Sequence, residues 1–253
     1  MSQLALFVAS LWSDPGKMFQ GIGYRAALAK TPYRTGCWPV FATPNETTGF
    51  LESVDFTDGA KTWNEACDLL ACGFHLVPNT ELASLLGCAL RSDFVEVNEQ
   101  QQTSLPEVYC AGEPTGIGGL EAALVQGEIA GLACAGQRID FLHNRNIREQ
   151  KFSARLEAAF RLRPELRLLA SSETIVCRCE DVTYGDLATR SGWTDAKLQT
   201  RCGMGPCQGR ICGPATQILF GWTPKSIRPP LSPVPVSALC FHDSQQIISQ
   251  ENA

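Results

Sequence analysis

The pattern of apolar and polar residues predicts a chain of mixed helices and strands. Residues 4–12 form an apolar segment, and residues 16–30 have the spacing of a helix. Residues 37–43 and 49–63 are predicted as strands, with a turn at Pro44 between them. The chain therefore begins with helical segments and continues into paired strands.

Two later segments are predicted to run from a strand into a loop. A short apolar strand at 69–72 leads into Gly73, and a helix is expected to start after Asn79. A second strand, at 108–111, stops at Gly112. Both glycines mark junctions at which the chain changes direction.

The loop after the second strand carries candidate ligand-binding residues. Glu113 lies at the carboxyl end of the predicted strand, where ligands bind in open α/β sheets. A glycine-rich loop, 115–119, then leads into a helix at 120–136, in which small residues recur at nearly helical spacing. A βα unit without any ligand is the alternative interpretation.

Two further segments differ from the rest of the chain in their content of charged residues and proline. Residues 137–172 form a charged, arginine-rich connector with helical spacing, and after Trp222 the chain becomes proline-rich and extended. The last residues, 243–253, are expected to be disordered. The letters GIGYRA (21–26) match a dinucleotide fingerprint, but no apolar strand precedes them, so no phosphate-binding turn is expected there.

Five of the twelve cysteines lie within residues 174–213. Two of them are separated by one residue, and the other three close the segment with four residues between neighbours: Cys177, Cys179, Cys202, Cys207 and Cys212. The polar run between the two groups is compatible with a helix and can fold back on itself. This arrangement predicts a four-thiolate pocket.

A [2Fe–2S] cluster, a zinc ion or plain thiols could explain this pattern. Structural zinc sites prefer two to four residues between paired cysteines, whereas a C-x-C pair suits two thiolates on one iron, so the spacing favours the cluster. Glycines at 203, 205 and 209 would let backbone N–H groups approach the sulfurs. Cys177, Cys179, Cys207 and Cys212 are the favoured ligands, and an alternative set replaces Cys212 with Cys202.

Composition excludes several function classes. The chain has 253 residues, 44% hydrophobic and 19% charged, which is typical of one large or two smaller globular domains. Its net charge of −5 argues against nucleic acid. No basic region precedes the apolar start, and no run approaches eighteen apolar residues, so neither a signal peptide nor a membrane span is expected.

The remaining cysteines and the histidines suggest no further chemistry. Seven cysteines are scattered, mostly in apolar runs, and are expected to act as small core residues: 37, 67, 72, 88, 110, 134 and 240. A metal site with thiolate ligands fits a reducing cytosol. No nucleophile–base–acid arrangement is recognisable, so the catalytic residues remain unknown, and His75 is expected to be structural.

The cysteine segment resembles a known iron–sulfur domain. VCRCEDVT followed by TRCGMGPCQGRIC is similar to the [2Fe–2S] domain of bacterioferritin-associated ferredoxin (BFD), in the form fused to the C-terminus of flavoprotein subunits. These subunits belong to opine oxidases, hydrogen cyanide synthase and proline or hydroxyproline dehydrogenases. In the related anaerobic glycerol-3-phosphate dehydrogenase, alanine stands at the position of Cys202. The resemblance therefore leaves Cys202 outside the ligand set.

Two further segments resemble flavoprotein motifs. Residues 68–79 are similar to the D-x-L-x-x-x-G-x-x-P-N segment that leads back into the FAD domain of flavin-dependent pyridine-nucleotide oxidoreductases. Residues 103–119 are similar to their second FAD motif, in which an acidic residue after glycine holds the ribityl chain; Glu113 replaces the usual aspartate. The resemblance implies these cofactor-binding residues: Gly73, Gly112, Glu113, Gly116, Ile117, Gly118 and Gly119.

The resemblance implies an α/β fold in several parts. A partial FAD/NAD-binding Rossmann-like (ββα) unit is followed by a small, mostly helical BFD-like domain. The expected parts are a remnant of an NAD-like unit, the C-terminal part of an FAD domain, a helical linker, the [2Fe–2S] domain and a proline-rich tail: 1–66, 67–140, 141–172, 173–222 and 223–253. The N-terminal FAD half of such subunits is missing, so the FAD site is expected to be incomplete.

The implied function is electron transfer in an oxidoreductase subunit. An amino acid or opine-type amine would be oxidised, and electrons would pass from FAD through a [2Fe–2S] cluster. The expected partners are a D-amino-acid-oxidase-like flavoprotein subunit, together with a small ferredoxin-like subunit, in the cytoplasm or attached to the inner membrane through partners. The alternatives are a stand-alone [2Fe–2S] electron-transfer or binding module without flavin, and a zinc-stabilised interaction domain.

Overall fold

The computed structural model describes residues 3–224, 227, 229–232 and 234–239. These residues form two compact units, one of Met1–Leu76 with Arg148–Leu169 and the other of Val77–Ile147 with Ala170–Ala253. The boundary between the units falls inside a single long helix. Each unit has its own packing.

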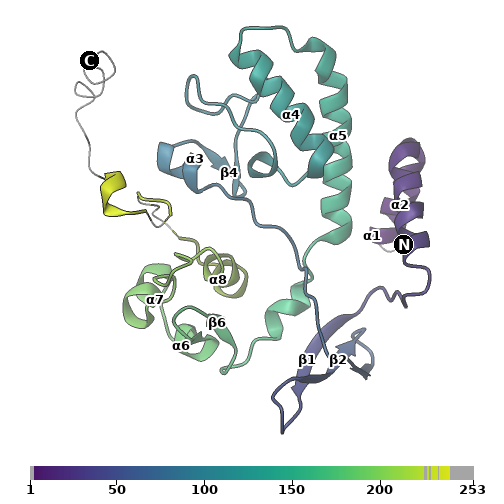
Figure 1. The fold of residues 1–253 in the computed structure, drawn as a ribbon, viewed down its shortest axis with the longest axis vertical. Coiled ribbons are helices and arrows are strands. Elements are labelled where there is room, and N and C mark those ends of the chain that lie inside the picture. Colours follow the sequence, from purple (N-terminus) through teal and green to yellow (C-terminus); the bar gives the residue numbers. More distant parts are fainter. Residues whose placement is uncertain (1–2, 225–226, 228, 233, 240–253) are drawn as a thin grey trace, which may run out of the picture. The chain divides into compact units, whose positions relative to one another are not determined.

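Helices and short strands alternate along the chain (Figure 1). The α-helices are α1 Gln3–Ser10, α2 Pro15–Ala27, α3 Glu81–Leu86, α4 Gly119–Cys134, α5 Asp140–Phe160, α6 Tyr184–Ala188, α7 Trp193–Thr200 and α8 Cys212–Phe220. The strands are β1 Trp38–Pro44, β2 Leu51–Thr57, β3 Thr62–Ala66, β4 Leu90–Arg91, β5 Phe94–Val95, β6 Ile175–Cys177 and β7 Val182–Thr183. Short 3-10 turns are η1 Leu11–Ser13, η2 Glu113–Thr115, η3 Pro164–Leu168 and η4 Val236–Leu239.

The first unit contains an antiparallel sheet in the order β1-β2-β3. Side chains fix both of its turns. Asn45 Oδ1 accepts hydrogen bonds from the backbone N–H groups of residues 47 and 48, and Asp58 Oδ1 accepts from those of residues 60 and 61. The bonds from Lys61 and Ala60 hold the pKa of Asp58 below its usual value. The predicted turn after Pro44 is therefore confirmed, but the strand predicted at 49–63 is divided into β2 and β3 by the second turn.

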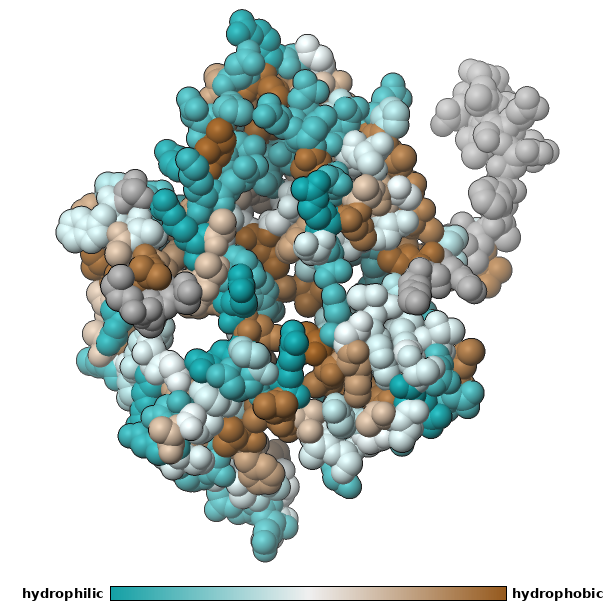
Figure 2. All heavy atoms as spheres, turned by 180° about the vertical axis from the view of Figure 1, so that it is seen from behind, coloured by the Kyte–Doolittle hydropathy of each residue, from teal (hydrophilic) through white to brown (hydrophobic). Residues whose placement is uncertain are grey.

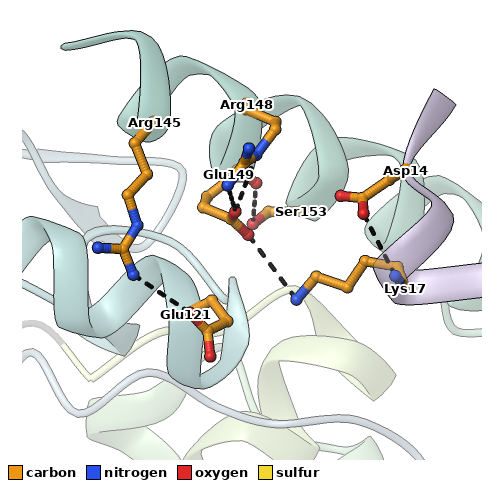
Figure 3. A network of polar contacts seen from close by, with 7 residues as sticks. All are labelled: Asp14, Lys17, Glu121, Arg145, Arg148, Glu149 and Ser153. Carbon is orange, nitrogen blue, oxygen red and sulfur yellow. Dashed lines mark hydrogen bonds and ion pairs between the residues drawn. The ribbon is translucent and has the colours of Figure 1, made fainter. Parts of the chain in front are cut away.

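Aromatic and charged contacts join the helices of this unit. The ring of Phe7 in α1 contacts those of Phe152 and Phe160 in α5, with centroids 6.0 and 5.8 Å apart. Lys17 Nζ in α2 lies 3.8 Å from the carboxylate of Glu149, which is buried on α5 (Figure 3). A buried carboxylate needs such a partner because removing its charge from water is costly.

One buried cluster of the second unit lies where α4 packs against the first part of α5. Val125, Ile129 and Leu142 form the buried cluster. Arg145 Nη2 donates to Glu121 Oε2 at 3.3 Å and ties the two helices together at the surface (Figure 3). This helical hairpin follows the loop in which the candidate flavin residues lie.

The cysteine-rich segment folds into a small group of elements within the second unit. The hairpin of β6 and β7 and the helices α6, α7 and α8 lie together (Figure 1). Their buried core consists of Val176, Cys177, Val182, Leu187, Trp193, Ala196, Cys202 and Cys212. Cysteines thus take part in the core as well as in the candidate site.

Three sequence predictions change in this structure. The strand predicted at 69–72 is wrong, because no described strand pairs with it and residues 67–80 form neither helix nor strand. The strand at 108–111 is reduced to one bridge between Tyr109 and Gln102. GIGYRA (21–26) lies inside α2, in keeping with the absence of a phosphate-binding turn.

The predicted mixture of helix and sheet is confirmed, but its finer assignment is not decided. Every strand pair among the described residues is antiparallel. The Rossmann-like unit, whose sheet would be parallel, remains a prediction. The predicted disordered end at 243–253 lies outside the described residues.

Many apolar side chains lie at the surface, where Figure 2 shows them in brown among polar residues in teal. Leu69 is 90% exposed and Trp12 is 77% exposed. Exposed apolar surface of this extent is typical of chains that bind partners. Within the described part of the chain, none of the helices is both long enough and apolar enough to cross a bilayer.

The start of α6 generates a stability prediction. Thr183 Oγ1 accepts from the backbone N–H of Asp186, and Asp186 Oδ2 accepts from that of Thr183, which forms a capping box. Thr183→Ala should therefore lower the free energy of unfolding by about 1 kcal/mol, measured in urea. Thr194→Ala, at an exposed position of α7, is the control. An equal loss in both variants would contradict the role of the cap.

Candidate functional site

The site is built from two loops that flank α6 and α7. Cys177 ends β6, and Cys179 follows in the tight turn toward β7. The helix α7 ends at Thr200, where Arg201 adopts a left-handed conformation (φ 64°) and sends Cys202 inward. The loop then returns through Cys207 to Cys212, the first residue of α8.

The structure brings three buried thiols together. The Sγ atoms of Cys177, Cys202 and Cys212 all lie within 4.8 Å of one another. These side chains are 1%, 0% and 0% exposed, and each is a free thiol. This group includes Cys202, which the sequence analysis kept as an alternative ligand.

The other two cysteines form a second, outward pair. The thiols of Cys179 and Cys207 hydrogen-bond each other, and both act electrostatically on the buried group. Cys179 is exposed and Cys207 is partly exposed. All five cysteines therefore converge, with one side of the group open to solvent. Which four bind a metal remains a prediction.

The thiols differ in how easily they ionise. Burial opposes ionisation of Cys207, but the backbone N–H of Ile211, the Cys179 thiol and the N–H groups of residues 209 and 210 outweigh it and lower its pKa. The hydrogen bond with Cys202, burial and the charge of that neighbour raise the pKa of Cys212 well above its usual range. Cys207 therefore ionises more easily than a free cysteine, and Cys212 less easily.

The outward thiol Cys179 holds its proton more tightly than a free cysteine. A backbone hydrogen bond with Cys207 lowers its pKa, but the hydrogen bond with the Cys207 thiol, desolvation and the charges of its neighbours raise it by more. A bound cation would reverse the balance, because thiols release their protons when they coordinate a metal.

Glycines form a close-fitting wall around the thiols. An added Cβ at Gly205 would overlap Cys179 Cβ, and one at Gly203 would lie 2.7 Å from the Trp193 ring. Gly203 also has a positive φ of 79°, which glycine adopts without strain. Glu180, next to Cys179, accepts a hydrogen bond from Arg201 Nε at 2.7 Å. The two loops are therefore held in close contact at the site.

The donor set fits an iron–sulfur cluster or a zinc ion. Both prefer thiolate sulfur, and free thiols in reach of one another can provide it after losing their protons. The backbone N–H groups around Cys207 match the donors that stabilise negative charge on cluster sulfurs. Chemistry and geometry thus agree with a metal centre at this place.

The side-chain amide of one buried glutamine supports the candidate flavin loop. Gln126 of α4 accepts hydrogen bonds from the Gly112 N–H at 2.8 Å and from Thr115 Oγ1 at 3.2 Å. Gly112 has a positive φ of 82°, and Ala123 of α4 packs close to it. Glu113 Oε2 is buried without a hydrogen-bond partner among the described residues. The loop therefore keeps one acceptor unpaired.

The other residues predicted around the flavin lie in different surroundings. Gly116, Ile117, Gly118 and Gly119 lead into α4, whose first turn has no side-chain cap. Gly73 belongs to the first unit and is exposed in the irregular segment after β3. The small residues Gly127 and Gly131 are exposed on α4 rather than packed.

The isolated cysteines only partly match their predicted core role. Cys88 is buried and Cys37, Cys67 and Cys110 are partly buried, whereas Cys72 and Cys134 are exposed. The expectation was wrong for these two because one lies in an unpaired segment and the other on the solvent side of α4. Cys240 lies outside the described residues.

Sequence reasoning missed three contributors to these sites. Trp193 covers the glycine wall, Gln126 supports the flavin loop, and the Glu180–Arg201 pair joins the two cysteine loops. Of these contributors, only Trp193 could have been noticed in the sequence, because it is a large apolar residue at the start of a polar helix. His75 has the structural role expected, since Nε2 lies 3.0 Å from Glu157 Oε2 and Nδ1 lies 2.9 Å from Leu76 O.

The glycine wall generates a prediction about metal binding. Gly205→Ala should displace Cys179 and lower the bound metal at least about tenfold, because coordination tolerates little ligand movement. Gly127→Ala is the control, since an added Cβ there meets nothing within 4 Å. Metal analysis of both purified variants is the measurement, and equal metal contents would contradict the wall's role.

Comparison with known proteins identifies relatives of this chain. No family model matches the chain. Hydrogen cyanide synthase subunit HcnB of Pseudomonas aeruginosa is 37% identical over 67% of this chain and 42% of its own length. HcnB of Pseudomonas protegens is 34% identical, over 77% of this chain and 47% of its own length. An opine oxidase subunit of Rhizobium meliloti is 34% identical, over 64% of this chain and 42% of its own length.

These relatives fix the class of the chain and the extent of the match. The chain spans 42–47% of the length of the three relatives. An NADH oxidase of Methanocaldococcus jannaschii also matches, at 35% identity over 34% of this chain and 21% of its own length. The chain is therefore homologous to oxidoreductase subunits of the hydrogen cyanide synthase and opine oxidase type, over slightly less than half of their length.

Proposed function

We propose that this chain is the iron–sulfur part of a flavin-dependent oxidoreductase subunit. The enzyme would oxidise an amino acid or opine-type amine, and electrons would pass from FAD through a [2Fe–2S] cluster held by this chain. The close grouping of three buried thiols, with the thiols of Cys179 and Cys207 beside them and closely packed glycines around them, carries the proposal. The names of the relatives, hydrogen cyanide synthase and opine oxidase subunits, support the type of reaction.

Cys177, Cys179, Cys207 and Cys212 are the proposed ligands. Cys177 and Cys212 come from the buried group, and Cys179 and Cys207 from the outward pair. A [2Fe–2S] cluster supplies one-electron oxidation and reduction when it is bound. The exposure of Cys179 supports this edge as the place at which electrons leave the chain.

The protein's own groups would control the charge and water around the cluster. Backbone N–H groups at 209–211 point at Cys207 and stabilise negative charge on its sulfur. The buried ring of Trp193 covers Gly203 and Gly209 and keeps water from that side. The outward pair stays accessible, so the pocket combines a dry interior with an open edge.

The loop at 112–119 is the proposed contact with flavin. Gln126 fixes the backbone at Gly112, and the unpaired oxygen of Glu113 can accept a hydrogen bond from a hydroxyl group such as those of a ribityl chain. We propose that this loop belongs to a partial FAD-binding unit, and that FAD binding is incomplete in this chain. Residues 67–80 would belong to the same FAD-binding unit, and residues 1–66 to the remnant of an NAD-like unit.

Two side-chain contacts support an electron path between the proposed cofactor regions. Arg210, in the cysteine loop, donates to Glu81 at the start of α3 at 2.7 Å. Gln217 of α8 donates to Asp93 at 2.7 Å. These bonds hold the BFD-like segment, 173–222, against the segment that precedes the proposed flavin loop.

The proposal includes partner subunits. The relatives are named as subunits, and exposed apolar residues on this chain offer surface for assembly. We propose that amine oxidation takes place in a D-amino-acid-oxidase-like flavoprotein subunit, with a small ferredoxin-like subunit for a further partner. The complex would work in the cytoplasm, with attachment to the inner membrane through its partners.

A stand-alone electron carrier is the second candidate. It is favoured by one observation, that the whole thiol pocket comes from residues 175–212 and needs no other part of the chain. Flavin content separates the two functions. Stoichiometric FAD on this chain, counted beyond the flavin of the flavoprotein partner, supports the enzyme subunit, whereas an iron-containing chain without flavin of its own supports the carrier.

The ligand assignment generates a direct test. Cys207→Ser should remove the visible absorption of the cluster, because backbone N–H groups lower the pKa of the Cys207 thiol and fit a bound thiolate. Cys134→Ser, at an exposed position of α4, is the matched control and should leave the spectrum unchanged. An unchanged spectrum for Cys207→Ser would exclude this residue as a ligand.

A further inference from the structure

The pocket contains one thiol more than a cluster needs. Four cysteines hold a [2Fe–2S] cluster, and five converge here. Cys202 is the fifth, and it lies on the buried side together with Cys177 and Cys212. Burial alone does not distinguish Cys202, because a free cysteine packs like a small apolar residue, but its closeness to two proposed ligands does.

The backbone holds Cys202 in a fixed position. The left-handed residue Arg201 turns the chain inward, and Thr200 Oγ1 accepts a hydrogen bond from the Cys202 N–H at 3.3 Å. Thr200 Oγ1 in turn donates to the carbonyl of Ala196 in α7. The Cys202 side chain is 0% exposed, so its sulfur can face only the interior of the site.

The sulfur atom of Cys202 lies close to those of two other cysteines. Its Sγ lies within 4.8 Å of those of Cys177 and Cys212, and its thiol forms a hydrogen bond with that of Cys212. Cys179 and Cys207 do not belong to this group of mutually close sulfur atoms. A small rotation of the side chain can therefore bring the Cys202 sulfur to the coordination position of Cys177 or Cys212.

We propose that Cys202 is a reserve ligand, which replaces Cys212 or Cys177 when either is lost. The inference rests on the proposed [2Fe–2S] function and adds a second way of holding the cluster. Cys202 would lose its thiol proton to solvent, and its thiolate would occupy the coordination position left by the missing cysteine. The oxidation state of iron does not change, and no further reactant is needed.

Single and double alanine variants test the proposal, with iron and acid-labile sulfide content and the EPR spectrum of the reduced protein as readouts. Alanine is used because it cannot bind a metal. Cys202→Ala should keep the wild-type spectrum. Cys212→Ala should keep iron and show shifted g-values, because Cys202 has taken the vacant position. The double variant Cys202→Ala/Cys212→Ala should lose iron at least about tenfold.

The outward pair provides the matched control. Cys207→Ala should lose the cluster whether or not Cys202 is present, because Cys207 does not belong to the group of mutually close sulfur atoms around Cys202. If Cys212→Ala does not fold, as judged by circular dichroism, the same comparison is made with Cys177→Ala. The two buried ligands are predicted to behave alike.

Different results would contradict the reserve role of Cys202 and the proposed [2Fe–2S] function. Loss of the cluster in Cys202→Ala would make this residue a resident ligand, and equal loss in the single and double variants would exclude exchange. Either result overturns the reserve role and leaves the proposed function in place. A wild-type protein without iron would instead overturn the proposed function.

Discussion

The close approach of the two cysteine loops is the constraint on which this part of the molecule depends. Gly205 lies so near Cys179 that an additional methyl group would not fit, and Trp193 packs directly on the glycines of the same loop. Three thiols are thereby buried together, with few hydrogen-bond partners except one another. A bound metal would replace their protons and satisfy all of them at once, so folding of the loops and metal binding are expected to stabilise each other.

Burial and charge divide the pocket into two sides. The hydrogen bond with Cys202 and burial raise the pKa of Cys212 on the buried side, whereas backbone N–H groups lower the pKa of Cys207 near the surface. This gradient suits a group that is held from inside and exchanges electrons at its outer edge. The contact of Arg210 with Glu81 extends the same arrangement toward the segment that precedes the candidate flavin loop. The cysteine loops and the loop at 112–119 therefore belong to one compact unit.

The sequence was sufficient where spacing determines local structure. The C-x-C pair and the three later cysteines predicted convergence, and the helix after Gly119 was predicted from its apolar spacing. The grouping of Cys202 with the buried thiols depends on a single left-handed residue, Arg201, which no periodicity reveals. The strand predicted at 69–72 is absent because a strand requires a neighbour, and apolar composition alone does not provide one. Support for the flavin loop by Gln126 likewise arises only from tertiary packing.

Low-temperature EPR of the chain, purified without oxygen and then reduced, tests the central claim most directly. The account predicts a rhombic signal from one unpaired electron per two iron atoms, in a protein that is red-brown before reduction. A colourless protein that contains zinc and gives no signal would contradict electron transfer by this chain. The thiol pocket would then be a structural metal site.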